Sequence, residues 1–266
     1  MYPRPQLKRE SFFLLNGQWD FAFDDENIGV LEGWSHTVRG DRKINVPFTY
    51  ETGKSGIGDE RPHGVIWYWK NITITNEFKK DQSIQINFEG CDYHLDLWVN
   101  GAYKGSHDGA YTRFAFELGK FAEGEEVLLS IRVEDPHSEE QVRGKQRWLS
   151  DNYGCWYVQT TGIWKDVWLE QVSDDYVEKI KITPDIYKKT VTIHTMCHSN
   201  KENLIMKSDV YFEGKFINSV SGKLEAGVCQ MDIDVYNKYV GEWGIELWSP
   251  DAPYLYTLKI LILDED

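Results

Sequence analysis

Apolar and polar residues alternate along most of this chain, which is the pattern of β-strands with one buried face. The clearest case lies in residues 83–100, SIQINFEGCDYHLDLWVN. Every second residue is apolar in 83–88 and again in 94–99, on either side of a polar corner, and Asn100-Gly101 supplies the two positive-φ positions of a tight hairpin. The stretch predicts an antiparallel sheet that builds a core.

Similar patterns flank this stretch. Residues 65–75, VIWYWKNITIT, place Trp67 and Trp69 on one face of a strand and apolar residues on the other, which predicts core packing on both faces. The one short helix predicted in this region lies within residues 24–34, and Pro47 limits the strand before it to an edge or an end of a sheet. Residues 49–64 and 136–157 predict two long loops, where binding usually resides.

The second half of the chain contains shorter strands behind a polar hinge at residues 173–175. Their spacing is that of a small immunoglobulin-like sandwich. No sustained period of 3.6 residues occurs anywhere in the chain. We therefore predict an all-β chain of two sandwiches, over residues 1–173 and 174–266.

The composition of the chain limits the classes of function that it can have. At 266 residues the chain is long enough for about two domains. Its formal charge of −14 repels phosphates, so neither nucleic acid nor an anionic membrane is an expected partner. Four widely spaced cysteines indicate neither a zinc site nor a disulfide framework. Without an apolar run behind its first basic residues the chain is expected in the cytoplasm, or in the periplasm if a signal peptide was removed.

Several separated blocks carry a resemblance to a known family. They are FEGCDYHLDLWVNG at 88–101, GSHDGAYT at 105–112, RGKQ at 143–146 and TGIW at 161–164, with LWSP at 247–250 and PYLY at 253–256 further on. In this order they resemble the first two domains of family-two glycoside hydrolases, the β-galactosidase and β-glucuronidase group. The resemblance implies a jelly-roll (galactose-binding-like) sandwich followed by an immunoglobulin-like sandwich.

In the resembled family both catalytic carboxylates lie on a (β/α)8 barrel that follows the two sandwiches. The chain ends at Asp266 without the alternation of strands and helices that a barrel requires, so we expect no barrel here and no catalytic residue. Asn76-Glu77 matches the family's Asn-Glu pair only superficially, because it lacks the barrel context. No cofactor is expected. The alternative is a structural calcium ion held by Asp92, Asp108 or Asp135.

The resemblance also implies a sugar contact. In the related enzymes the segment just before the Thr161-Gly162-Ile163 block reaches to the barrel mouth and contacts the sugar. Where β-galactosidases place a carboxylate this chain has Trp156, for which stacking on a sugar ring is the natural role. The substrate-binding residues predicted on this basis are Arg143, Gln146, Trp148, Trp156 and Tyr157. The alternative is that Trp148 and Trp156 only close the loop onto the sandwich.

We therefore expect the non-catalytic amino-terminal part of a retaining glycoside hydrolase that cleaves terminal β-glycosidic bonds. Its expected partners are carbohydrate and a following catalytic barrel. Association into an oligomer is an open alternative. Two other hypotheses stay open at this point. One is a free-standing carbohydrate-binding or adhesive protein, and the other is a small all-β enzyme with an unrecognised site.

The first prediction concerns activity. The purified chain should not hydrolyse chromogenic β-galactosides, β-glucuronides or β-mannosides, because retaining hydrolysis needs two carboxylates about 5–5.5 Å apart with separate roles. Release of nitrophenol followed by absorbance is the measurement. Turnover that copurifies with the chain and disappears on mutation of one of its own acids would contradict the prediction.

Overall fold

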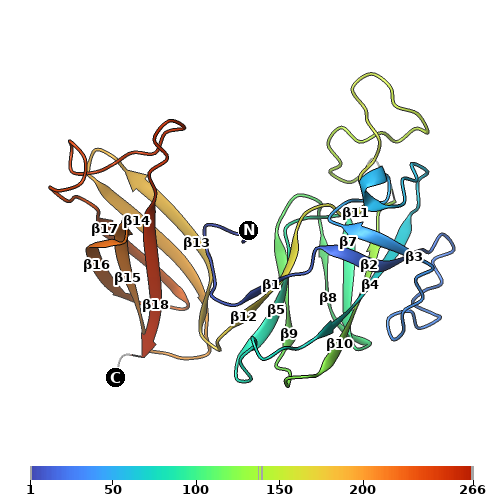
Figure 1. Ribbon diagram of the computed structural model, residues 1–266, viewed down its shortest axis with the longest axis horizontal. Helices are drawn as coiled ribbons and strands as arrows, with labels where there is room; N and C mark the ends of the chain where they lie inside the picture. The colour runs from blue at the N-terminus through green and yellow to red at the C-terminus, as the bar shows by residue number, and fades with distance from the viewer. Residues whose placement is uncertain (1, 137, 139, 265–266) are drawn as a thin grey trace. The chain divides into compact units, whose positions relative to one another are not determined.

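A computed structural model describes residues 2–136, 138 and 140–264 of the protein (Figure 1). The chain divides into two compact units, Met1–Val172 and Ser173–Asp266. Both consist of antiparallel strands and irregular loops, and the helical content of the described part is one short 3-10 turn, η1 (Gly53–Ser55). The predicted all-β class is confirmed.

The first unit is a sandwich of two sheets. The larger sheet has the spatial order β3 (Arg42–Val46), β2 (Gly17–Phe23), β4 (Val65–Thr73), β10 (Glu126–Glu134), β7 (His94–Val99) and β8 (Ala102–Asp108). The smaller has the order β1 (Phe12–Leu14), β12 (Val167–Val172), β5 (Ser83–Phe88) and β9 (Phe114–Gly119). A separate ladder pairs β6 (Cys91–Asp92) with β11 (Gly162–Ile163). As Pro47 predicted, β3 is an edge strand that ends just before the proline.

The apolar residues of β5 and β7 fill the space between the sheets. All six are at most 4% exposed: Ile84, Ile86, Phe88, Leu95, Leu97 and Val99. The prediction that these two segments build one sheet is wrong, because β5 pairs with β9 and β12 whereas β7 pairs with β8 and β10. The polar corner between them carries the chain from one sheet to the other. The tight turn is confirmed, with φ of 49° at Asn100 and 80° at Gly101.

Strand β4 is buried on both faces, as predicted. One face adds Ile66 and Tyr68 to the main core between the sheets. The other face stacks Trp67 on Trp69, with ring centres 5.8 Å apart, in a second cluster that includes Trp98. Tryptophan therefore covers the outer surface of the central strand, which is a structural role.

The helix predicted within residues 24–34 does not form, and this segment folds into successive turns. The Asp24 carboxylate accepts hydrogen bonds from the amides of Ile28 and Gly29 at 2.8 and 2.9 Å, and from the Trp67 ring at 2.9 Å. A side chain that takes up backbone amides competes with the helical pattern. Gly33 takes a φ of 71° within these turns, which continue to residue 36.

An amino-terminal arm covers β12. Glu170 of this strand is fully buried, and its carboxylate accepts hydrogen bonds from the ring nitrogen of Trp168 at 2.7 Å and from Arg9 Nε at 2.8 Å. The Tyr2 hydroxyl also donates to Glu170. Since a buried carboxylate is tolerated only when it is paired and hydrogen-bonded, the arm belongs to the folded unit.

The second unit is the immunoglobulin-like sandwich. One sheet has the order β13 (Tyr176–Asp185), β14 (Thr190–His198), β17 (Val228–Asp234), and the other β16 (Lys215–Lys223), β15 (Leu204–Phe212), β18 (Tyr256–Asp264). Glu213 and Gly214, at φ 47° and 75°, form the turn between β15 and β16. Ile193, Val210 and Ile233 form the centre of its core. The described part of the chain contains no helix with the length and apolar character needed to cross a membrane.

The second prediction compares two glycines with positive φ. A Cβ on Gly162 (φ 89°) would lie 2.1 Å from the hydroxyl oxygen of Tyr68, whereas a Cβ on Gly124 (φ 83°) meets no atom within 4 Å. Gly124→Ala should lose about 1 kcal/mol of unfolding free energy through backbone strain alone. Gly162→Ala should lose roughly 2 kcal/mol more, because it also overpacks the core. Urea unfolding of both variants is the measurement, and equal losses would show that Tyr68 moves aside freely.

Candidate functional site

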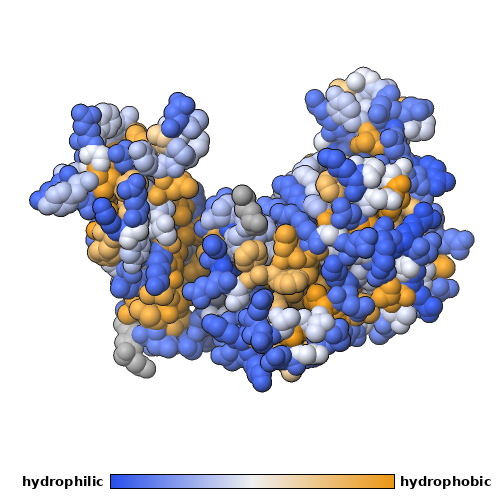
Figure 2. All heavy atoms as spheres, in the orientation of Figure 1, coloured by the Kyte–Doolittle hydropathy of each residue, from blue (hydrophilic) through white to orange (hydrophobic). Residues whose placement is uncertain are grey.

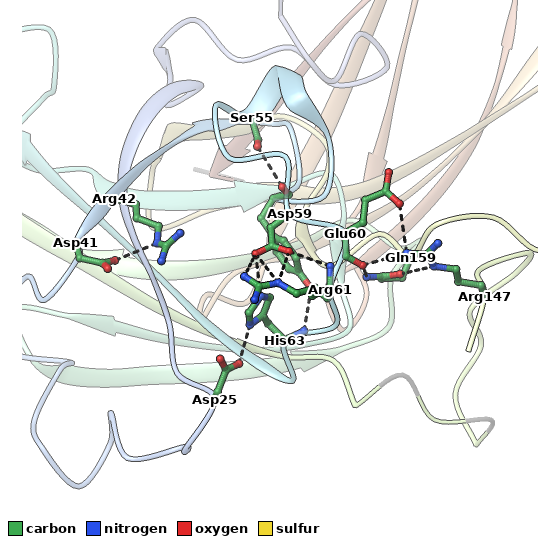
Figure 3. A network of polar contacts seen from close by, with 11 residues as sticks. Asp25, Asp41, Arg42, Ser55, Asp59, Glu60, Arg61, His63, Arg147 and Gln159 are labelled. Atoms are coloured by element: carbon green, nitrogen blue, oxygen red, sulfur yellow. Dashed lines mark hydrogen bonds and ion pairs between the residues drawn. The ribbon is translucent and has the colours of Figure 1, made fainter. Parts of the chain in front are cut away.

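The two long loops of the first unit are joined by a polar network (Figure 3). Arg147 of the second long loop (residues 136–157) is only 6% exposed. Its guanidinium donates to the side-chain oxygen of Gln159 at 3.2 Å and to the carbonyl of Glu60, in the first long loop (residues 49–64), at 3.0 Å. The Gln159 amide donates to the same carbonyl at 3.0 Å. A buried cation with fixed acceptors holds one loop against the other.

The first long loop has its own charged contacts, also drawn in Figure 3. Asp59 receives a two-pronged ion pair from Arg61, with contacts of 2.9 and 2.5 Å, and this pairing holds the pKa of the Asp59 carboxyl well below its usual range. His63 Nδ1 lies 2.8 Å from Asp25, and its ring stacks on Phe23. These contacts order the first long loop.

Buried carboxylates hold the segment that follows the second long loop. Glu51 accepts a hydrogen bond from the Thr161 amide at 3.0 Å, and Asp135 accepts one from the Thr161 hydroxyl at 3.0 Å. Burial raises the pKa of Glu51 to about 7. The position of Thr161 is therefore determined by two acidic side chains from distant parts of the sequence.

Gln146 ties the second long loop to the corner between the two sheets. Its side-chain amide donates to Asp92 Oδ2 at 2.6 Å, and its oxygen accepts a hydrogen bond from the Thr160 amide at 2.7 Å. Burial, and secondarily the negative charge of Asp135, raise the pKa of Asp92 to about 7. The other oxygen of Asp92, Oδ1, is buried without a hydrogen-bond partner among the described residues.

A pocket of about 240 Å³ opens beside this loop. Three of the five residues predicted to bind substrate line it, namely Arg143, Gln146 and Tyr157. The rest of the lining includes Asp92, Tyr111, Lys145 and Trp164. The pocket thus combines aromatic rings, two cationic side chains and a buried carboxyl group, which is a lining suited to a small polar molecule with an apolar face.

Trp148 and Trp156 are not among the lining residues of this pocket. Their rings pack edge to face on each other with centres 4.8 Å apart, and the Arg143 guanidinium lies 4.5 Å from the Trp148 ring centre. This packing favours the hypothesis that the two tryptophans close the loop. A direct contact of either ring with a sugar stays a prediction.

Six lining residues were not predicted to bind substrate: Asp92, Tyr111, Lys145, Val158, Thr160 and Trp164. For Trp164 the sequence held one signal, the glycine at position 90 in the corner between the sheets. A Cβ on Gly90 would lie 2.9 Å from Trp164 Nε1, so the glycine leaves room for the tryptophan, which donates to the Ala110 carbonyl at 2.9 Å. Gly90 thus leaves the space at this corner that the Trp164 ring occupies.

Other candidate residues lie outside the pocket. Asn76-Glu77 occupies an exposed turn between β4 and β5. Of the three acids considered for calcium, Asp108 pairs with His94 at 2.8 Å. Within residues 2–136, 138 and 140–264, no group of three or more histidine, cysteine or acidic side chains is arranged to hold a metal ion.

Two sandwiches and a loop-lined polar pocket define an all-β protein, and sequence comparison identifies the family. Residues 12–173 match the family model described as glycosyl hydrolases family 2, sugar binding domain. The chain belongs to glycosyl hydrolase family 2, and its first unit is the sugar-binding domain of that family.

Several proteins of this family resemble the chain over most of its length. It is 24% identical to a β-glucuronidase of Paenibacillus borealis over 99% of the chain and 44% of that protein. It is 27% identical to a β-galactosidase of Thermoanaerobacterium thermosulfurigenes over 92% of the chain and 34% of that protein. The fold matches a Ruminococcus gnavus β-glucuronidase with a TM-score of 0.72 at 17% identity, over 99% of the chain and 44% of that structure. The chain therefore spans less than half the length of these relatives.

The third prediction concerns pH. Glu51 and Asp92 have folded-state pKa values raised to about 7, well above the values near 4 of an unfolded chain. Between about pH 4 and pH 7 the folded state keeps protons that the unfolded state has released, so these groups lower stability as pH rises and their effect levels off above pH 7. As pH rises from 5 to 8, the unfolding free energies of Glu51→Gln and Asp92→Asn should increase by roughly 1–3 kcal/mol relative to that of the unmodified protein.

Urea unfolding at pH 5, 6, 7 and 8 provides the measurement. Glu123→Gln is the matched control, because Glu123 is an exposed acid in a loop of the same unit and its removal should leave the pH profile unchanged. Profiles of Glu51→Gln and Asp92→Asn that run parallel to that of the control would show that neither buried group titrates in this range.

Proposed function

We propose that this chain is the non-catalytic amino-terminal part of a retaining glycoside hydrolase and that its second long loop shapes the sugar pocket of a following (β/α)8 barrel. The observation that carries this proposal is the pocket beside the loop. Arg143, Gln146 and Tyr157 line it on a backbone held by buried contacts, which is the preorganisation that a positioning surface requires.

The chemistry of the pocket supports a role in binding rather than in bond cleavage. Retaining hydrolysis needs a nucleophile and an acid/base close together. Asp92 is the one carboxylate among the described lining residues, and it is engaged by Gln146. A hydroxyl of a sugar that enters the pocket could donate to its unpaired oxygen, while Tyr157, which is 57% exposed, offers a ring face.

The relatives support the rest of the proposal. They are named β-galactosidases and β-glucuronidases, so we propose terminal β-glycosides as the substrates of the whole protein. They are also more than twice as long as the matched segment, which supports further domains in the parent. A free-standing carbohydrate-binding protein is the competing function, and sequencing the reading frame beyond codon 266 distinguishes the two.

The fourth prediction is that sugar binding by this chain alone is weak and depends on the second long loop. A ring covering roughly 100 Å² of a sugar contributes about 2.5 kcal/mol, whereas a millimolar dissociation constant requires about 4 kcal/mol. Galactose and glucuronic acid should therefore bind with dissociation constants of about a millimolar or weaker. Tyr157→Ala should abolish this binding, and Trp156→Ala should reduce it less, because Trp156 packs inside the loop.

Amide chemical shifts followed during sugar titration provide the measurement. Tyr103→Ala is the control, since this ring is 55% exposed on β8 and does not line the pocket. Micromolar binding that survives Tyr157→Ala would reject the pocket and favour a dedicated binding protein with its site elsewhere.

A further inference from the structure

The pocket in the first unit is bordered by a short turn, residues 108–112, which begins at the end of edge strand β8. Tyr111 of this turn lines the pocket beside Trp164, with ring centres 6.0 Å apart. The Tyr111 hydroxyl oxygen lies 3.0 Å from the position of a Cβ on Gly144, so the ring rests against the backbone of the second long loop. This loop projects from the unit and carries mainly hydrophilic residues (Figure 1, Figure 2), so its position depends on specific contacts such as this one.

Hydrogen bonds tie the 108–112 turn to the residues around it. The Gly109 amide donates to the Tyr93 carbonyl at 3.1 Å, and the Ala110 carbonyl accepts a hydrogen bond from the ring N–H of Trp164 at 2.9 Å. Ala110 is itself only 1% exposed. A shift of the chain at the end of β8 would therefore reach, through Gly109 and Ala110, a ring that lines the pocket.

One imidazole ring holds the start of this turn. His94 of β7 lies directly opposite Asp108 in the β7–β8 ladder, and its Nδ1 is 2.8 Å from the Asp108 carboxylate. Its Nε2 is 3.3 Å from the Asp96 carboxylate. A neutral imidazole carries one N–H and can donate to only one of these acids, whereas the imidazolium ion donates to both. Both contacts are therefore favourable only when His94 is protonated.

The two acids differ in how firmly they are held. Asp96 also accepts a hydrogen bond from the Tyr103 hydroxyl at 3.0 Å and lies 3.4 Å from the guanidinium of Arg132. The Asp108 side chain is 68% exposed and belongs to an edge strand. When His94 loses its proton, one ring nitrogen presents a lone pair to a carboxylate. The exposed Asp108 carboxylate is the one that can then move into solvent.

The remaining charged groups around His94 do not replace this proton. Glu134, opposite His94 in the β7–β10 ladder, pairs with Arg132 at 2.6 Å. Burial lowers the pKa of His107 on β8, so this ring is neutral where His94 titrates. For His94 itself burial lowers the pKa, but the hydrogen bonds and charges of the two acids outweigh burial and raise the pKa above its ordinary value of 6.5.

We propose that His94 acts as a pH-dependent switch for this pocket. The imidazolium ion holds Asp96 and Asp108 together and so keeps the 108–112 turn, with Tyr111, against the second long loop. Loss of the proton releases Asp108 and loosens the turn, so the pocket is better formed in acidic than in alkaline solution. The switch acts on the same site as the proposed function and rests on that proposal for the nature of the ligand, a sugar.

The indole N–H signal of Trp164 reports directly on the turn, because this group donates to the Ala110 carbonyl. In ¹H–¹⁵N spectra of the whole chain between pH 5.5 and pH 9, its chemical shift should change with the same midpoint as the ring signals of His94. That midpoint should lie above pH 6.5. Since Asp92 lines the same pocket and has a pKa of about 7, the spectra are also recorded for Asp92→Asn, where the change linked to His94 should persist.

Two variants test the two ends of the switch. His94→Gln keeps a hydrogen-bonding side chain without a titrating group and should abolish the change at Trp164. Asp108→Asn removes the exposed acid and should also abolish it, while His94 titrates at a lower pH. His36→Gln is the matched control, because His36 is an exposed histidine of the same unit, and in this variant the change should remain. The His94 and Asp108 side chains are 30% and 68% exposed, so the variants should fold, and urea unfolding checks this.

Binding of methyl β-galactoside, whose charge does not vary with pH, provides the second readout. At pH 6 His94→Gln should bind this sugar about two- to fivefold more weakly than the unmodified chain, and at pH 9 the two should bind it alike. Comparison at equal pH cancels the contribution of Asp92. If no sugar binds at either pH, the proposed function fails, while the Trp164 signal still decides whether the switch exists.

Four results would overturn the switch. They are a Trp164 signal that does not change with pH, a change that survives in His94→Gln, a midpoint for His94 below pH 6.5, and a loss of sugar affinity in His94→Gln that is the same at pH 6 and pH 9. The last of these would show that His94 supports the pocket without responding to pH.

Discussion

The short ladder between β6 and β11 is the contact on which the loops of the first unit depend. It brings Gly162 against Tyr68 with no space for a side chain, and this fixes the backbone at the point where the second long loop returns to the sandwich. Glu51 and Asp135 then hold Thr161 from the other side. Because the loop is closed at its base by a packed core, its outer part can be polar and still ordered.

The buried acids at the base of the second long loop lower the free energy of unfolding but fix the position of the chain that contacts them. Glu51 and Asp92 are buried acids whose charged forms are disfavoured by desolvation, yet each accepts a hydrogen bond from the returning chain. Hydrophobic side chains of the same size could fill this space more stably. They could not, however, select one position for Thr161 and Gln146. The arrangement is therefore better suited to holding a site than to maximising the free energy of unfolding.

The sequence predicted the strands well because period-2 alternation reports burial directly, as in β5 and β7. It did not predict that these strands lie in different sheets, since a corner and a hairpin turn have similar local composition. The helix predicted within residues 24–34 does not form because the Asp24 carboxylate accepts the amides of Ile28 and Gly29. The same carboxylate also accepts the Trp67 ring, a contact with a distant strand that no local pattern reveals.

The second long loop supplies three of the predicted residues, Arg143, Gln146 and Tyr157, to the pocket lining because they lie within one segment of the sequence. Their contact with a sugar stays a prediction. Asp92 and Trp164 reach the same pocket from other segments, through pairings that only the folded chain displays.

The amino-terminal arm bears on where the first domain begins. The family model starts at residue 12, but Tyr2 and Arg9 lie upstream of it and contact the fully buried Glu170. A chain trimmed to the family boundary would lose the cation that pairs with Glu170 and also the segment that covers it, so water would have to replace both. The structural unit is therefore longer than the segment that the family model matches, and an expression boundary drawn from sequence similarity alone would remove part of the structure that it was meant to isolate.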